Sequence, residues 1–105
     1  MKKVNILGTE YSIEIDDTFE KTELDGLCKE YDKRISIRNA GSMLNDDDST
    51  DVKKIRFDEV LRHEIIHAFF YESGLDDYSG NEQLVDWIAK QFPKLEKAFK
   101  EADCL

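Results

Sequence analysis

The sequence has few of the residues that mark disulfide-rich, metal-thiolate or membrane proteins. Its 105 residues include two cysteines and one proline. Cys28 and Cys104 are far apart and lack CxxC spacing, so we expect two free thiols. No apolar run approaches the roughly 20 residues that cross a bilayer, and the residues after Met1 do not form a signal-peptide core. These absences predict a cytoplasmic protein without a membrane partner.

Basic charge is also scarce. There are 15 Lys and Arg residues against 24 Asp and Glu residues, which gives a net charge of −9. An acidic surface repels phosphate backbones, so we expect no nucleic-acid partner. Hydrophobic residues make up 40% and charged residues 37%, which is ordinary for a folded protein. At this length the sequence predicts a single domain over residues 1–105.

The N-terminal half has patterns typical of strands. Residues 4–15 alternate on both sides of a Gly8-Thr9 turn signal, which predicts a β-hairpin. Residues 16–33 are polar and aperiodic, and we expect a loop there. Residues 34–39 alternate again, which predicts a third strand that could lie at a sheet edge.

The C-terminal half has patterns typical of helices. The acidic residues 45–51 lack the glycine and the closing glutamate of a calcium loop, so we expect a solvated loop that caps a helix. Apolar residues at helical spacing predict a long helix over residues 52–73 and a second over 81–92, after which Pro93 breaks or kinks it. The fold class is therefore predicted as α+β. We expect an antiparallel or mixed sheet of about three strands, packed on a long active-site helix and followed by C-terminal helices.

The segment from His63 to His67 has the sequence HEIIH. On a helix it places both imidazoles on one face, about 5–6 Å apart at Cβ. Two neutral imidazoles at this spacing can bind one Zn²⁺ ion. Glu64 is then placed to take a proton from a zinc-bound water and return it to the leaving amine. The alternative, histidines that are merely packed or solvated, is less favoured because the chain has only these two and both fall in the motif.

Two histidines leave a catalytic zinc ion short of a third protein ligand. Glu82 is our prediction, carried on the second helix. In the alternative, Ser79 and Glu82 form a capping box, and the glutamate only satisfies a backbone amide. Asp76 or Asp77 in the preceding loop could bind instead, and a terminal Cys104 thiolate is a further donor.

Three more residues could assist the site. Asp86 lies one helical turn after Glu82, where it could accept the second ring N–H of His63 and orient that ligand, or it could be solvated. Tyr78 is a catalytic candidate because its hydroxyl could stabilise an oxyanion, and Tyr71 is another. Aromatic packing is the alternative for both tyrosines.

Together, the His63 to His67 motif and the Glu82 and Asp86 pair resemble the gluzincin metallopeptidases, whose second motif is a glutamate with an aspartate four residues on. Over residues 31–92 the chain looks most like the mini-gluzincins and the ImmA/IrrE-type metallo-endopeptidases of bacteria and mobile elements. The resemblance implies a zincin-like fold and an intracellular, zinc-dependent hydrolase. It further implies a protein substrate, such as a repressor, that lies extended along a sheet edge formed by residues 34–39.

The resemblance to mini-gluzincins also suggests a dormant state in which residues 99–105 cover the cleft. The leading hypothesis is a zinc peptidase that cuts a specific protein. An alternative is a zinc-stabilised interaction module without catalysis, for which Glu64 would be dispensable. A third is a metal-free adaptor whose acidic surface binds a basic partner.

Overall fold

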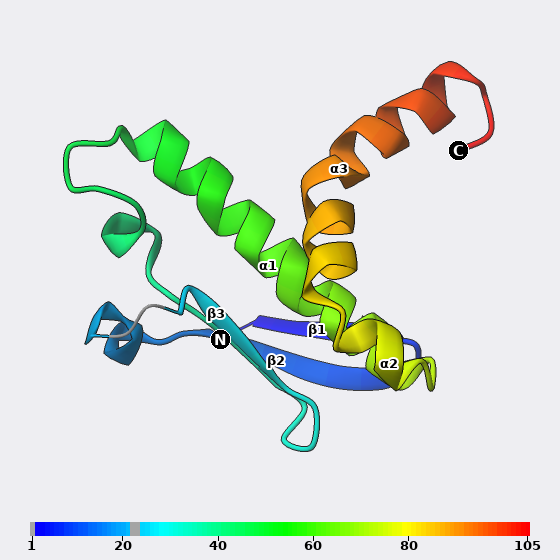
Figure 1. Ribbon diagram of the computed structural model, residues 1–105, viewed down its shortest axis with the longest axis horizontal. Coiled ribbons are helices and arrows are strands. Elements are labelled where there is room, and N and C mark those ends of the chain that lie inside the picture. The colour runs from blue at the N-terminus through cyan, green and yellow to red at the C-terminus, as the bar shows by residue number, and fades with distance from the viewer. Residues whose placement is uncertain (1, 22–23) are drawn as a thin grey trace.

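The computed structural model describes residues 2–21 and 24–105 (Figure 1). The four strands are β1 Lys2–Ile6, β2 Thr9–Ile15, β3 Gly26–Lys29 and β4 Arg34–Ile37. The α-helices are α1 Thr50–Glu72, α2 Asp76–Ser79 and α3 Glu82–Glu101, and two 3₁₀ turns cover Asp17–Lys21 and Ala40–Ser42. The predicted α+β class, with strands before helices, is confirmed.

β1 and β2 form the predicted hairpin. Its turn consists of Leu7 and Gly8, with φ angles of 52° and 92°. Two positive φ angles in a two-residue loop are typical of the type I′ turn, whose twist matches that of the strands. The Gly8 N–H also donates to Asn5 Oδ1 at 2.9 Å. The turn therefore falls one residue before the predicted Gly8-Thr9 position.

The sheet is mixed, with the order β1-β2-β4-β3 and a parallel pairing only between β2 and β4. The prediction that residues 34–39 form an edge is wrong, because β4 lies between β2 and β3. The predicted loop over residues 16–33 is also wrong in part, since it contains a 3₁₀ turn and β3. β3 has four residues, which is too few to show the alternation of a strand in the sequence. It is a strand because its backbone pairs with β4. The edge strand on this side of the sheet is therefore β3.

The core lies between one face of the sheet and α1. Alternate side chains on each strand point to that face. Its fully or nearly fully buried members come from the strands, one loop and α1: Ile6, Tyr11, Ile13, Ile35, Ile37, Met43, Val60 and Ala68. Each large apolar side chain buried in this way contributes about 1.5–3 kcal/mol. This packing fixes α1 firmly on the sheet.

Polar contacts hold both ends of α1. At its start, the Ser49 side chain accepts a hydrogen bond from the backbone N–H three residues later, as an N-cap should. At its end, Glu72 accepts hydrogen bonds from Tyr11 Oη at 2.6 Å, Thr9 Oγ1 at 2.8 Å and Lys33 Nζ at 2.9 Å. The C-terminal end of α1 is thereby tied to the hairpin and to the turn before β4.

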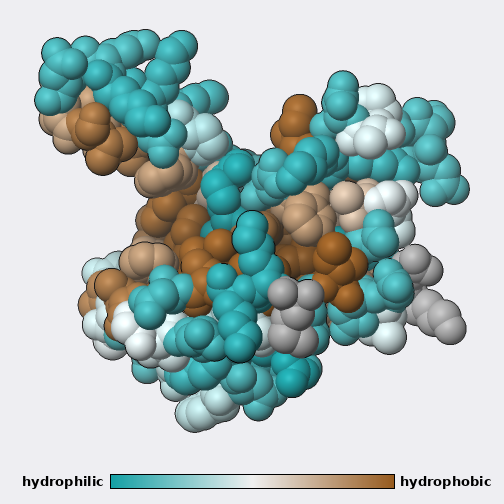
Figure 2. All heavy atoms as spheres, turned by 180° about the vertical axis from the view of Figure 1, so that it is seen from behind, coloured by the Kyte–Doolittle hydropathy of each residue, from teal (hydrophilic) through white to brown (hydrophobic). Residues whose placement is uncertain are grey.

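α3 runs through Pro93 without a break. Its ribbon changes direction along its length, and its C-terminal half leads away from α1 (Figure 1). Seen from behind, apolar side chains line the hollow between this projecting half and the rest of the molecule (Figure 2). None of the helices in residues 2–21 and 24–105 combines the length and apolar character needed to cross a membrane.

Candidate metal centre

Two histidines on α1 and a glutamate at the start of α3 converge on one point. The Nε2 atoms of His63 and His67 lie 3.1 Å apart. The two carboxylate oxygens of Glu82 lie 3.0 Å from His63 Nε2 and 3.0 Å from His67 Nε2. Two ligand atoms at tetrahedral angles around zinc, each 2.0–2.1 Å from it, would be about 3.3 Å apart. His63, His67 and Glu82 are therefore close enough to bind one metal ion.

The fold fixes the orientation of the His67 ring. Its Nδ1 faces the backbone carbonyl of Ser79, at the end of α2. A carbonyl can only accept a hydrogen bond, so Nδ1 carries a proton and Nε2 is the ring nitrogen that faces the site. The Ser79 hydroxyl donates in return to the His67 carbonyl at 3.0 Å. Ser79 thus holds both the backbone and the ring of this ligand.

Asp86 performs a similar task for His63. Asp86 Oδ1 lies 3.5 Å from His63 Nδ1, and Oδ2 lies 2.9 Å from Lys90 Nζ. The Lys90 hydrogen bond is the main cause that lowers the pKa of Asp86, so this residue is a carboxylate. It therefore favours a proton on Nδ1 and a lone pair on Nε2.

The resulting arrangement suits a cation. Two imidazole nitrogens and the Glu82 carboxylate face one another at about hydrogen-bond distance. Nitrogen and carboxylate oxygen atoms that converge in this way are the donors that zinc takes from proteins. The helix cap does not explain Glu82, because Asn81 is the N-cap and accepts from Leu84 N at 3.0 Å. The Glu82 side chain is 71% exposed, so an ion would reach it directly from solvent.

Glu64 lies on the buried face of α1, and only 7% of its surface is exposed. Its nearest wall is β3, where a Cβ placed on Gly26 would be 3.1 Å from Glu64 Oε2 and 2.8 Å from Val60 Cγ1. Burial, and then the charges of Glu82 and Glu30, raise the pKa of Glu64 to about 7. A carboxyl group with a pKa near neutrality is suited to general-base catalysis.

The site opens into a cleft of about 670 Å³. Its walls are α1 on one side and β3 on the other, and α2 and the start of α3 close it in part. A second hollow of about 540 Å³ borders His63 and Glu82 and is also lined by Trp87 and Lys90. The metal-ligand atoms are thus accessible to a large molecule.

The alternative ligands are not brought to the histidines. Asp76 lines the cleft, but neither it nor Asp77 joins the metal-ligand cluster found among the described residues. Cys104 is exposed, and its thiol donates to a backbone carbonyl in α3. Residues 99–105 lie at the end of α3 farthest from α2, so the expected cover over the cleft is not formed (Figure 1).

The two tyrosine candidates differ in position. The Tyr78 ring packs against Phe70 with centroids 5.9 Å apart, and the residue is 51% exposed outside the cleft lining. Tyr71 does line the cleft. Its ring contacts Tyr31 edge-on and lies 5.0 Å from Lys33 Nζ. Of the two, Tyr71 is the one whose side chain borders the site.

Two residues of the site were not predicted. Ser79 orients His67 across twelve residues, and no local pattern signals such a contact. Gly26 allows β3 to approach Glu64, and an isolated glycine before a short apolar stretch can indicate such close approach. The sequence therefore contained an indication at Gly26, but it could not be interpreted because β3 was not predicted as a strand.

No protein-family model, curated protein or solved structure matches this chain. The interpretation of the site therefore depends on its own geometry. That geometry comprises three convergent ligand residues, two groups that orient the histidines, and a buried carboxyl group in an open cleft.

Proposed function

We propose that this chain is a zincin-like, zinc-dependent metallo-endopeptidase that hydrolyses peptide bonds in a specific intracellular protein. The observation that carries the proposal is the convergence of His63, His67 and Glu82 beside the buried carboxyl group of Glu64. Imidazole and carboxylate donors of this kind, three in number, are the usual protein ligands of catalytic zinc. The resemblance to gluzincins supports the same assignment.

Zinc, when bound, would polarise a carbonyl group and lower the pKa of a coordinated water to about 7. Glu64 would accept a proton from the attacking water while the water oxygen forms a bond to the carbonyl carbon. The same carboxyl group would deliver that proton to the leaving nitrogen as the C–N bond breaks. Ser79 and Asp86 would hold the two imidazoles in place through these steps.

A substrate would lie along β3 rather than along residues 34–39. β3 is an edge of the sheet and lines the cleft directly opposite Glu64. An extended peptide can pair with such an edge through its backbone, which would carry its scissile bond past the metal ligands. Of the two tyrosines, only Tyr71 borders the cleft, so only Tyr71 is placed to contact a bound substrate.

The open cleft favours an enzyme over a zinc-stabilised interaction module. Structural zinc sites are closed by four protein ligands, whereas catalytic sites keep one position free. The described residues offer three ligands here, and they face a cleft large enough for a peptide. A purely structural site also gives no reason to bury an unpaired carboxyl group beside it.

The first test is the zinc content of protein purified without added metal or chelator. We expect about one zinc ion per chain in the wild type, loss of zinc in His67→Ala and weaker binding in Glu82→Ala. Absence of zinc even after reconstitution would contradict the proposal.

The second test separates catalysis from binding. Glu64→Gln should keep its zinc and lose hydrolysis of a mixed peptide library by about 10²-fold or more, because the general base is removed. Glu59→Gln is the matched control, since it makes the same change on the same helix in the cleft lining. An intact biological function in Glu64→Gln would instead support the interaction module.

A further inference from the structure

The cleft carries more negative charge than the proposed reaction needs. Glu64, Glu82 and Asp86 already have roles as base, ligand and orienting group. The remaining carboxylates lie toward the two ends of the cleft, and Arg56 is the sole lysine or arginine among the described residues that line it. The two ends differ in how these charges are balanced.

At the end nearer the start of α1, the charges are paired. Arg56 donates to Asp25 Oδ2 at 2.9 Å and to Glu59 Oε2 at 3.2 Å. Arg38, which is almost fully buried, donates to Asp25 Oδ1 at 3.0 Å. Two guanidinium groups thus balance two carboxylates, and this end offers little net charge to a substrate.

At the other end, beyond His67, two carboxylates are unpaired. Glu30 follows β3, and Asp76 begins α2. Both line the cleft, as does Tyr71, and neither carboxylate has an ion pair or side-chain hydrogen bond within the described part of the chain. Carboxylates with an aromatic ring beside them are the groups that bind the side chains of lysine and arginine.

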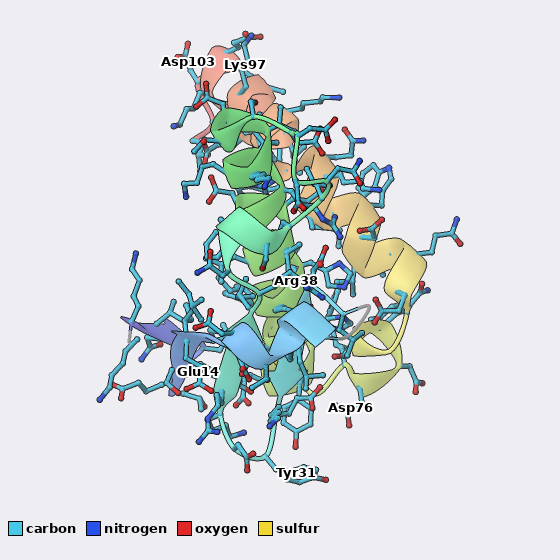
Figure 3. The ribbon with its side chains drawn as sticks, turned by 90° about the vertical axis from the view of Figure 1, so that its left-hand side faces the viewer. Glu14, Tyr31, Arg38, Asp76, Lys97 and Asp103 are labelled. Carbon is cyan, nitrogen blue, oxygen red and sulfur yellow. The ribbon has the colours of Figure 1, made fainter. Side chains whose placement is uncertain are left out.

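The cation beside Tyr71 does not neutralise this end. Lys33 lies 5.0 Å from the Tyr71 ring, but its ammonium group is bound to Glu72 at 2.9 Å and it does not line the cleft. Asp76 and Tyr31 lie at the same end of the molecule, opposite Lys97 on the projecting half of α3 (Figure 3). Lys97 is therefore remote from Asp76, and Lys90 of α3 is bound to Asp86 at 2.9 Å.

The same cleft also contains a polar side chain without a partner. Glu64 is more than nine-tenths buried, faces the cleft, and makes no hydrogen bond or ion pair with any described residue. Its carboxyl oxygens are open to the cleft, because no fully buried side-chain oxygen among the described residues lacks a hydrogen-bond partner. The acidic end is therefore continuous with a cleft in which Glu64 also offers a carboxyl group to a ligand.

The distance along α1 between the metal ligands and the acidic end determines which substrate residue would lie at that end. From His67 to Tyr71 is about one helical turn, or roughly 6 Å along α1. An extended peptide advances about 3.3 Å per residue, so this distance corresponds to about two residues. A side chain at the acidic end would thus belong to a residue about two positions from the scissile bond.

On the basis of the proposed peptidase function, we propose that the cleft selects substrates with a lysine or arginine on one side of the scissile bond. Glu30 and Asp76 bind this basic side chain at the Tyr71 end of the cleft. The opposite end, where Arg56 is paired, has no charge preference. The substrate class is thus a protein segment with a basic residue close to the cut bond.

The test uses two capped hexapeptides that differ only by lysine or glutamine at one position, together with a library of random decapeptides. Cut sites in the library, determined by mass spectrometry with zinc-loaded protein, should show lysine or arginine enriched on one side only. Calorimetry with the Glu64→Gln variant should show the lysine hexapeptide binding about tenfold more tightly than its glutamine counterpart. Glu30→Gln and Asp76→Asn should each reduce that ratio toward one.

The controls are Asp32→Asn and Asp77→Asn. Like Glu30→Gln and Asp76→Asn, each removes one negative charge, but Asp32 and Asp77 do not line the cleft. They should leave the ratio unchanged, which separates a local subsite from general attraction to an acidic protein. Cleavage without charge preference would overturn this inference and leave the peptidase proposal intact. Lysine-selective binding that depends on Glu30, but without cleavage of any peptide, would overturn the peptidase proposal and support a cleft for basic peptides.

Discussion

Gly26 determines how closely β3 can approach α1. A methyl group at this position would lie 2.8 Å from Val60 Cγ1, well inside van der Waals contact. We predict that Gly26→Ala lowers the free energy of unfolding by about 1–3 kcal/mol, as overpacking of a core does. In a Val60→Ala background, Gly26→Ala should lower the free energy of unfolding by less than it does in the wild type, because the clashing methyl group is gone. Urea unfolding of the single and double variants measures both effects.

Gly80→Ala is the control for this substitution. A Cβ at Gly80 would meet only backbone oxygens at 3.8 Å, which is an ordinary contact. Its free energy of unfolding should remain close to that of the wild type. If Gly26→Ala were equally harmless, or if it cost as much in the Val60→Ala background as in the wild type, the close approach of β3 to α1 would not be as the structure shows.

Glu72 makes the stability of the protein sensitive to acid. Hydrogen bonds from Tyr11, Lys33 and Thr9 lower the pKa of Glu72 from its ordinary value of 4.5 to about 2. Because the pKa is lowered in the folded state, this stabilisation is fully present above pH 4.5 and is lost as the pH falls toward 2. We predict that the difference in unfolding free energy between wild type and Glu72→Gln narrows over this range. Chemical unfolding at pH 7, 4.5 and 3 measures that difference.

Other carboxylates titrate over the same range, so the comparison needs a second glutamate. Glu101 lies at the exposed end of α3. Because the Glu101 side chain is 70% exposed, Glu101→Gln should change the free energy of unfolding little at each of the three pH values. A constant difference for Glu72→Gln as well would show that its hydrogen bonds do not favour the charged form.

At the scale of elements, α1 and α3 are joined where a proline interrupts the hydrogen bonds of a helix. Pro93 has no N–H, so the Ala89 carbonyl lacks its usual partner four residues on. Arg62 Nε on α1 donates to this carbonyl at 2.8 Å. We predict that Arg62→Met lowers the free energy of unfolding by about 1–3 kcal/mol, because the carbonyl is left unsatisfied.

A double-mutant cycle tests this explanation. In a Pro93→Ala background the new N–H can satisfy Ala89, so Arg62→Met should cost less than it does in the wild type. Lys97→Met, on the exposed part of α3, should cost little in either background. If the effects of Arg62→Met and Pro93→Ala on the free energy of unfolding were strictly additive, the hydrogen bond from Arg62 would not compensate for the N–H that Pro93 lacks.

The sequence predicts elements well where local patterns determine them. α1 was placed within two residues at its start and one at its end, because cap residues and a long helical stretch are local signals. Its buried face was less predictable: Ile55 and Phe69 are largely exposed, whereas Glu64 and His67 are buried. β3 was missed because only pairing with β4 makes it a strand.

In the candidate site, too, the features set by local sequence were predicted and those set by packing between elements were not. The convergence of His63 and His67 is built into one helix, so five residues of sequence are enough to predict it. Glu82 was predicted from a motif, and the path of α2 then brings it to the histidines. Ser79 and the wall formed by β3 depend on how separate elements pack, which the sequence pattern alone does not specify.

For the whole molecule, a metal ion at this site would add a further connection between α1 and α3, which already pack against each other. His63 and His67 belong to α1, which is packed on the sheet, while Glu82 begins a helix whose second half projects into solvent. A ligand that binds only the folded state stabilises it by RT ln(1 + [L]/Kd). At a free zinc concentration of about 100 times Kd, this amounts to about 2.7 kcal/mol.

We therefore predict that zinc raises the midpoint of thermal unfolding of the wild type and that a chelator reverses the change. In Glu82→Gln the rise should be smaller, because one ligand is lost and α3 is no longer held to α1 through the ion. Glu96→Gln makes the same substitution farther along α3 and should respond to zinc as the wild type does. If zinc shifted the midpoint equally in Glu82→Gln and in the wild type, α3 would not contribute a ligand. The ion would then be held by α1 alone, and the link between the sheet-bound helix and α3 would have to come from Arg62 and the apolar contacts of α3.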